Sequence, residues 1–219
     1  MRWFFHGNSE EDEVIEVIKA GGWLMWPILA CSVIALAIII ERFWSLRRKR
    51  VLPGGLVKTL RTWAKVGKIP EINLDSIAVK SPLGRVVVAG LLNREQGREI
   101  VKERIEDTGR RVVHELERFL NTLGTIATIT PLLGLLGTVV GMIDVFTVIS
   151  VQGTGDAGLL AGGISQALIT TAAGLTVAIP SLLFYRYFCG KVDELVVRME
   201  EEAICLVDVI HMSTLRERS

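Results

Sequence analysis

Three long runs of apolar residues divide this sequence. The first run without a charged residue is 23–40, which holds 18 residues and is near the shortest length that crosses the hydrocarbon core of a bilayer. The second is 119–143 with 25 residues, and the third is 157–185 with 29. The glycine-rich start of the third run, 157–163, predicts a turn, so the span itself is expected from about residue 164. Three such runs predict an all-α membrane protein with three transmembrane helices.

The charges beside the first run predict its orientation. Acidic residues precede it, and a basic cluster follows it at Arg42 and residues 47–50. A signal peptide has a basic N-terminal region and a small-residue cleavage site, so this run is predicted to be a membrane anchor. Basic residues remain in the cytoplasm, so the cluster places the N-terminus outside. Arg186 and Lys191 place the C-terminus inside, and the expected location is the inner membrane of a bacterium.

These patterns predict seven segments. They are a periplasmic amphipathic N-terminus at 1–22, a first transmembrane helix at 23–45, a cytoplasmic helical domain at 46–118, a second transmembrane helix at 119–149, a periplasmic loop at 150–163, a third transmembrane helix at 164–188 and a cytoplasmic C-terminal helix at 189–219. Within the first, residues 10–19 are expected to form a short acidic helix at the outer surface. Aromatic residues flank the first span as interfacial anchors, at Trp23, Trp26, Phe43 and Trp44.

The segment 46–118 is punctuated by glycine and proline, which predicts several short helices joined by turns. Ser81-Pro82 reads as a helix N-cap followed by proline in the first turn, and this helix should end near Leu92. Apolar residues then recur at helical spacing, at Val101, Ile105, Val112, Leu116 and Phe119. Because no glycine or proline follows residue 110 before the second span, we expect one continuous helix over about 98–149.

The C-terminal segment repeats this pattern. Its apolar positions follow a 3–4 spacing, at Val192, Leu195, Met199, Ala203, Leu206 and Ile210. The third span should therefore continue into the cytoplasm as a second long helix. An apolar stripe outside the membrane requires a partner, so the extensions of the second and third spans are predicted to join a cytoplasmic helical bundle or to contact a neighbouring subunit.

Composition narrows the classes of function. Half of the residues are hydrophobic and the formal net charge is +1, so nothing favours nucleic acid as a partner. Three scattered cysteines show no CxxC or Cys/His spacing, and no metal or other cofactor is expected. No nucleophile–base or phosphate-loop pattern occurs, and His6, His114 and His211 lie far apart. The sequence therefore predicts a protein that is not an enzyme.

The second and third spans carry small and hydroxyl-bearing residues. Gly134, Gly137 and Gly141 lie on roughly one face of the second span, with Thr130 and Thr138 near them. In the third span Gln166, Thr170, Gly163 and Gly174 share a face, while Thr171 lies about 140° from Gln166 on an ideal helix. Small residues let membrane helices approach closely, and each threonine alone could simply bond a carbonyl one turn back. Taken together, they predict a polar face turned toward protein or water.

Pro131 and Pro180 interrupt the backbone hydrogen bonding of these spans. They either kink the helices or free carbonyls that neighbouring helices must satisfy. No acidic or basic residue lies near the middle of any span, since Glu41 and Asp144 are at the ends. This chain therefore has no evident group of its own to carry a proton, and a second subunit is expected to supply one.

The same two spans resemble the MotA/TolQ/ExbB proton channel family, and within it the ExbB branch. The resemblance rests on TPLLGLLGTVVGMI at 130–143, on GISQALITTAAGL at 163–175 and on VAIP at 177–180. Two further segments look like the family, AGGW through Glu41-Arg42 and SPLGR through 89–91. The match covers most of the chain from residue 14.

This resemblance implies a homopentamer around a central pore lined by the second and third spans. Two copies of an ExbD-like single-span subunit would lie inside it, and the membrane aspartate of that subunit would carry the proton. The complex would use the proton motive force to drive a TonB-like protein, which energises outer-membrane active transport. The pore threonines of the family match Thr138 and Thr171. The family often has glutamate where this chain has Gln166, and an amide cannot titrate.

Other interpretations remain open at this point. A TolQ-like subunit would use the same spans for envelope integrity. A MotA-like flagellar stator would need a further span and a larger cytoplasmic domain. A static membrane scaffold would conduct no ions and would hold a dry, tightly packed core with no partner helix.

Overall fold

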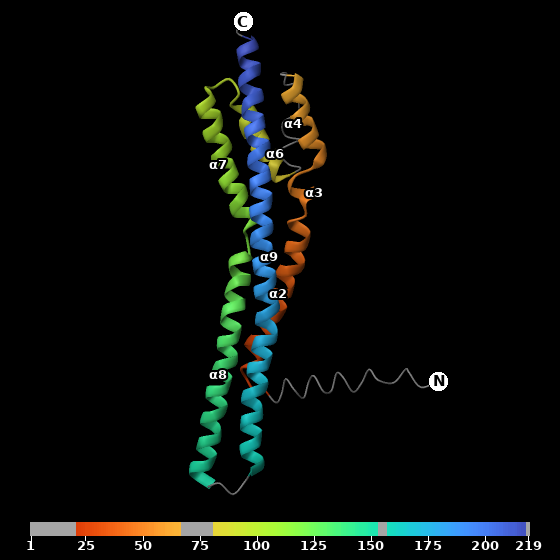
Figure 1. Ribbon diagram of the computed structural model, residues 1–219. Coiled ribbons are helices and arrows are strands. Elements are labelled where there is room, and N and C mark those ends of the chain that lie inside the picture. The colour runs from red at the N-terminus through yellow and green to blue at the C-terminus, as the bar shows by residue number, and fades with distance from the viewer. Residues whose placement is uncertain (1–20, 67–80, 153–156, 218–219) are drawn as a thin grey trace, which may run out of the picture. The chain divides into compact units, whose positions relative to one another are not determined.

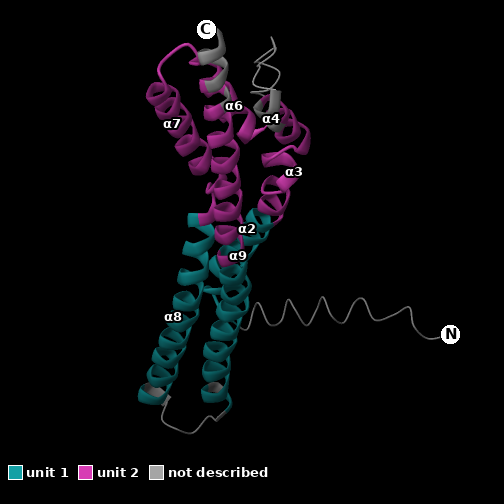
Figure 2. Ribbon diagram, turned by 45° about the horizontal axis from the view of Figure 1, so that its top comes forward, with its two compact units in different colours: residues 1–39, 121–185 teal, residues 40–120, 186–219 magenta. Residues whose placement is uncertain are grey.

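The computed structural model describes residues 21–66, 81–152 and 157–217 of the chain, and every regular element in them is helical. The helices are α2 (Met25–Ser45), α3 (Arg48–Val51), α4 (Gly54–Val66), α6 (Pro82–Leu92), α7 (Arg98–Leu116), α8 (Leu120–Gln152) and α9 (Ala157–Glu217) (Figure 1). The helix expected at 10–19 lies outside the described residues. The chain divides into two compact units, one from 1–39 and 121–185, the other from 40–120 and 186–219 (Figure 2).

The first unit is made of parts of long apolar helices. Among the residues that the structure describes, three helical stretches are long and apolar enough to cross a membrane, and they lie within Met25–Ser45, Arg98–Ser150 and Leu160–Asp208. Large apolar side chains on α8 and α9 are exposed, among them Leu132, Val139, Phe146, Leu168, Ile179 and Leu183. So much exposed apolar surface needs lipid or another protein to cover it. The prediction of an all-helical membrane protein with three possible spans is confirmed.

The start of helix α9 differs from the sequence-based prediction. The helix runs without interruption from Ala157 to Glu217, which confirms the long C-terminal helix but makes the predicted turn at 157–163 wrong. Gly163 serves the packing of the helix instead, because a Cβ there would come within 2.4 Å of the Val145 Cγ2 on α8. Close approach between membrane helices therefore accounts for this glycine better than turn formation does.

The second unit is a helical bundle whose core follows the predicted stripes. Short helices α3, α4 and α6 occupy the segment before α7, as predicted. On α7 and α9 the apolar positions of the stripes are buried, namely Val101, Ile105, Val112, Leu116, Val192, Leu195, Met199, Ala203, Leu206 and Ile210. Gly90 lets α6 approach them, since a Cβ at Gly90 would meet the Ile105 Cδ1 at 2.8 Å and the Leu206 Cδ2 at 3.1 Å.

Helix α6 begins and ends where the sequence predicts. The Ser81 hydroxyl accepts a hydrogen bond from the Gly84 N–H at 3.0 Å, and Pro82 occupies the first turn. An N-cap satisfies one of the N–H groups that have no partner within the helix. This cap is buried, so water cannot replace it.

Replacing Ser81 by alanine is expected to destabilise the second unit. Loss of a serine N-cap costs about 1 kcal/mol, so the midpoint of thermal unfolding of the detergent-purified protein should fall. Thr62→Ala is the control, because the Thr62 hydroxyl is exposed and bonds only the Lys58 carbonyl oxygen of its own helix. Equal midpoints for the two variants would contradict a stabilising cap.

The junction of α7 and α8 also differs from the sequence-based prediction. A continuous helix was predicted over 98–149, but α7 ends at Leu116 and α8 begins at Leu120. Phe119, predicted as the next member of the buried stripe, is partly exposed and has a positive φ of 64°. An L-residue in this conformation cannot continue a right-handed helix, so the break occurs without glycine or proline.

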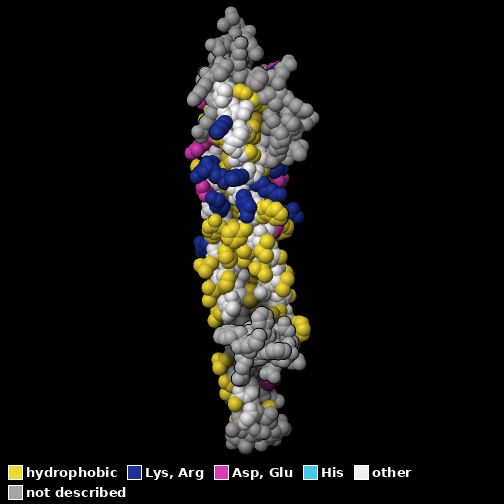
Figure 3. Space-filling view, turned by 90° about the vertical axis from the view of Figure 1, so that its right-hand side faces the viewer, with side chains coloured by type: hydrophobic (Ala, Val, Ile, Leu, Met, Phe, Trp, Pro, Cys, Tyr) yellow, Lys and Arg dark blue, Asp and Glu magenta, His cyan; other side chains and the backbone are white. Residues whose placement is uncertain are grey.

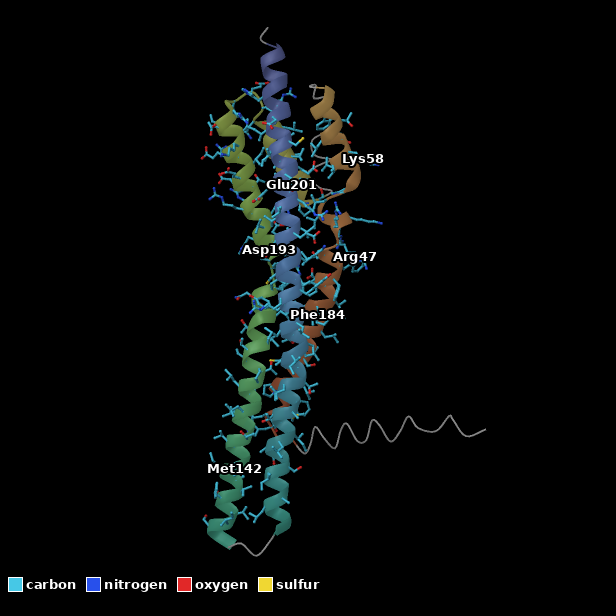
Figure 4. The ribbon with its side chains drawn as sticks, in the orientation of Figure 1. Arg47, Lys58, Met142, Phe184, Asp193 and Glu201 are labelled. Atoms are coloured by element: carbon cyan, nitrogen blue, oxygen red, sulfur yellow. The ribbon has the colours of Figure 1, made fainter. Side chains whose placement is uncertain are left out.

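Charged side chains cover much of the second unit. Lysine and arginine side chains gather in one band on the face shown in Figure 3. In Figure 4, Arg47 precedes α3, Lys58 lies on α4, and Asp193 and Glu201 lie on α9. Both Arg47 and Lys58 are exposed.

One ion pair ties α6 to α7. Arg85 donates two hydrogen bonds to the Glu115 carboxylate, at 2.7 and 2.6 Å. These bonds lower the pKa of Glu115 below its ordinary value, so the pair stabilises the fold at neutral pH and loses this effect as the pH falls through the carboxyl range. Both side chains are substantially exposed, which keeps the contribution small.

Candidate functional site

The predicted site residues lie mainly where α8 and α9 pack together in the first unit. The two helices approach to backbone contact at Gly134 and Gly174. A Cβ at Gly174 would lie 2.7 Å from the Thr130 backbone oxygen and 3.2 Å from the Gly134 Cα, and a Cβ at Gly134 would lie 3.0 Å from the Thr171 Cα. Only glycine allows this approach, which is the arrangement that stabilises helix pairs in lipid.

The contact extends along α8 through two more of the predicted glycines. A Cβ at Gly137 would lie 2.5 Å from the Thr170 Cγ2, and one at Gly141 would lie 3.0 Å from the Ala167 Cβ. The structure thus brings Gly134, Gly137, Gly141 and Gly174 together in one interface. Both helices continue through their prolines, Pro131 and Pro180.

Two of the threonines that were predicted to form the polar face of these spans are covered by the chain itself. Thr130 is 0% exposed and its hydroxyl donates to the Ile126 carbonyl oxygen of the same helix. Thr170 is 1% exposed. Its hydroxyl donates to two backbone carbonyl oxygens, that of Gly21 at 2.9 Å and that of Gln166 at 2.8 Å. Within one subunit these two side chains contribute to helix packing.

The surroundings of Thr171 and Thr138 differ from those of Thr130 and Thr170. The half-buried Thr171 hydroxyl donates across the interface to the Gly134 carbonyl oxygen at 2.8 Å. In a regular helix this same carbonyl accepts the N–H of Thr138, so the two threonines share one backbone acceptor. The Thr138 hydroxyl donates to the Leu135 carbonyl oxygen of its own helix at 2.7 Å, and its side chain remains partly exposed.

Gln166 lies beside a turn that sequence reasoning did not include in the site. Gly22, just before α2, has a φ of 71°, and a Cβ there would come within 2.3 Å of the Gln166 Nε2. Gly21 of the same turn supplies the carbonyl that Thr170 binds. Two consecutive glycines immediately before the first apolar run were the signal available in the sequence, since a positive φ favours glycine.

The site is polar without being charged. Its polar groups are hydroxyls, one amide and backbone carbonyls, and within the described residues no group of three or more His, Cys, Asp or Glu side chains could hold a metal ion. Hydroxyls and carbonyls can bond water or another helix, but they do not titrate near neutral pH. By themselves these described groups can exchange hydrogen bonds, and they have no side chain that stores a proton near neutral pH.

Comparison with known proteins places the α8 and α9 residues of this site within a matched region. A sequence model of the MotA/TolQ/ExbB proton channel family matches residues 78–201. The chain is 33% identical over 181 residues to the biopolymer transport protein ExbB-like 1 of Synechocystis sp., covering 81% of this chain and 71% of the relative. It is 35% identical over 176 residues to ExbB-like 3 of the same organism, covering 77% and 81%. An ExbB homolog of Methanothermobacter thermautotrophicus is 28% identical over 188 residues, covering 85% and 67%.

Proposed function

Because the chain belongs to the MotA/TolQ/ExbB proton channel family, we propose that it is the ExbB-like subunit of a proton-driven motor in a bacterial inner membrane. In this proposal the subunits assemble as a pentamer, and α8 and α9 of each subunit face a central pore. An ExbD-like single-span partner occupies the pore, and the complex drives a TonB-like protein that energises outer-membrane transport.

The observation that carries the proposal is the shared carbonyl of Gly134. The Thr171 hydroxyl binds it across the α8–α9 contact, and the helix places Thr138 one turn further on. A hydroxyl-bearing surface therefore begins where the two helices are held closest together. Such a surface offers hydrogen bonds to a passing helix or to water without a fixed charge that would trap a carboxylate.

Thr138, Thr171 and Gln166 are the residues proposed to face the pore. Thr130 and Thr170 are proposed to hold the walls in place, because the subunit covers both hydroxyls. Gln166 bonds the partner or water without titrating. The proton is carried by a carboxylate of the partner, and each proton that crosses 100 mV releases about 2.3 kcal/mol. Neutralising that carboxylate lets the partner helix move past the polar surface.

In the same proposal the exposed basic cluster at residues 47–50 marks the cytoplasmic side. Arg47, Arg48, Lys49 and Arg50 directly follow α2, and all four are exposed. Positive residues remain on the cytoplasmic side, so the N-terminus is periplasmic and the bundle of the second unit is cytoplasmic.

The proposal predicts co-purification with one small partner. The affinity-tagged chain, extracted in mild detergent from its own organism, should bring down a protein with a single span and one aspartate in that span. Changing this aspartate to asparagine should abolish uptake driven by the proton motive force while the complex still assembles, since only the proton carrier is removed.

Three results would contradict parts of the proposal. Purification without a single-span partner would favour a scaffold with a closed core. An aspartate-to-asparagine partner that still supports uptake would exclude it as the proton carrier. If the complex restored envelope integrity to a deletion strain and left outer-membrane uptake unchanged, the chain would have a TolQ-like role.

A further inference from the structure

A cavity of about 800 Å³ opens within the second unit. Helices α3 and α4 form one wall of it, with Arg48, Lys49 and Val57 among the residues that line it. Helix α9 forms the other wall, from Asp193 to Glu202. A cavity of this volume falls within the range of sites that bind small molecules.

The wall formed by α3 is cationic. Arg48 and Lys49 are both exposed, and neither forms an ion pair with another residue that the structure describes. The planar guanidinium group matches the geometry of phosphate oxygens, and the lysine ammonium binds phosphate as a compact charge. This wall therefore offers two cations to an anionic group that enters the cavity.

The wall formed by α9 is acidic. Asp193 and Glu201 lie on α9 (Figure 4), both are exposed, and within the described part of the chain neither has an ion-pair partner. Glu202 is 6% exposed and lines the same cavity. The charge of Glu194 is balanced by Arg198, whose Nη2 lies 2.8 Å from the Glu194 Oε1. The cavity thus separates cations on one wall from carboxylates on the other.

The membrane end of this cavity lies near the level of lipid headgroups. Within the second unit the Phe43 ring of α2 packs against Tyr187 and Phe188 of α9, with ring centroids 6.0 and 5.2 Å apart. Aromatic residues of this kind gather where the hydrocarbon meets water. Asp193 follows Tyr187 by six residues, which is about 9 Å along a helix. Because the interfacial layer extends roughly 5–8 Å beyond the hydrocarbon, a headgroup can reach Asp193 and Arg48.

We propose that this cavity binds a phosphate ester that carries a primary ammonium group, as in the headgroup of phosphatidylethanolamine. Arg48 and Lys49 hold the phosphate, and Asp193 and Glu201 accept hydrogen bonds from the ammonium, which has three N–H donors. A ligand with only negative charge would be repelled by the α9 wall, and a ligand with only positive charge by the α3 wall. A ligand with both charges bridges the two walls and holds α3 against α9.

Thermal unfolding of the detergent-purified full chain tests which ligand the cavity takes. Short-chain phosphatidylethanolamine should raise the midpoint in a saturable way, since a ligand that binds only the folded state stabilises it. Short-chain phosphatidylcholine has no N–H on its ammonium and phosphatidylglycerol has no ammonium, so both should raise the midpoint less. Soluble phosphoethanolamine is titrated in parallel. An equal effect of this compound would identify a soluble ligand of the same chemistry, and a weaker effect would identify the lipid.

Substitutions on each wall test the proposed contacts. Lys49→Gln and Asp193→Asn should each weaken the binding of phosphatidylethanolamine by roughly tenfold, because each removes one charge-assisted hydrogen bond. Arg47→Gln and Glu200→Gln are the matched controls, since both residues are exposed and lie outside the lining of the cavity. Both control variants should bind the lipid as the unchanged chain does.

The response to Asp193→Asn separates this proposal from a simple anion site. If the variant bound phosphatidylglycerol and phosphatidylethanolamine more tightly, the α9 wall would only repel phosphate, and the proposal would be overturned. Equal stabilisation by all three lipids would overturn it as well. Arg48→Gln and Glu201→Gln repeat the comparison with a second residue from each wall, so that the result holds if Lys49→Gln or Asp193→Asn lowers the midpoint without ligand.

Discussion

Gly174→Ala is expected to separate α8 from α9 and to abolish the proposed motor activity. The added methyl group would lie 2.7 Å from the Thr130 backbone oxygen and 3.2 Å from the Gly134 Cα. A backbone cannot rotate away as a flexible side chain can, so the helices must move apart. Overpacking of this kind costs about 1–3 kcal/mol. The midpoint of thermal unfolding in detergent should fall, and uptake driven by the proton motive force should be lost in a deletion strain that carries the variant.

The same helix provides matched controls for this substitution. Gly162 and Gly190 also lie within α9, and a Cβ at either would meet nothing within 4 Å. Alanine is favoured over glycine in a helix interior by about 0.5–1 kcal/mol, so Gly162→Ala and Gly190→Ala should leave the midpoint unchanged or raise it slightly. If Gly174→Ala behaved as they do, close contact at this position would be excluded.

The helices themselves could be predicted from the sequence because their signals are local. Ser81-Pro82 supplies both an N-cap and a suitable first helical residue, and α6 begins there. The apolar stripes of α7 and α9 repeat at helical spacing, and their members are buried, from Val101 to Ile210. A periodic stripe needs no knowledge of its partner to be recognised, since one face of a helix must be covered.

The break at 117–119 could not be predicted in this way. Phe119 continues the spacing of the α7 stripe, and no helix-breaking residue precedes it. At the break, Arg42 donates a hydrogen bond to the Leu116 carbonyl oxygen from 74 residues earlier in the chain. Contacts between residues so far apart in the chain cannot be predicted from the pattern of a single sequence.

In the candidate site, too, the surroundings of single side chains could not be predicted from the sequence. In the sequence Thr130, Thr138, Thr170 and Thr171 are alike, and their spacing indicates only that a polar face exists. The carbonyl oxygen that accepts the Thr170 hydrogen bond belongs to Gly21, 149 residues away. Which hydroxyl packs inside the subunit and which stays accessible depends on the rotation of α9 against α8 and on where the turn before α2 lies.

Replacing Thr138 and Thr171 together by valine is expected to reduce proton-driven uptake more than tenfold. Valine has nearly the shape of threonine, so the helices should still pack, but both hydroxyl groups are lost. The change also removes the donor to the Gly134 carbonyl. Interhelical hydrogen bonds in membranes contribute only about 0.6 kcal/mol on average, so the loss of uptake should far exceed the loss of stability. Uptake and thermal unfolding are measured on the same variant.

Two comparisons separate the pore role from packing. Thr171→Ser keeps the hydroxyl that donates to Gly134 and should retain uptake. The double variant Thr128→Val with Thr176→Val removes two exposed hydroxyls that bond only carbonyls of their own helices, and it should also retain uptake. Normal uptake in the Thr138 and Thr171 double variant would show that these hydroxyls do not form the surface past which the partner carboxylate moves. Equal loss in both double variants would instead indicate a general effect of losing hydroxyl groups from these spans.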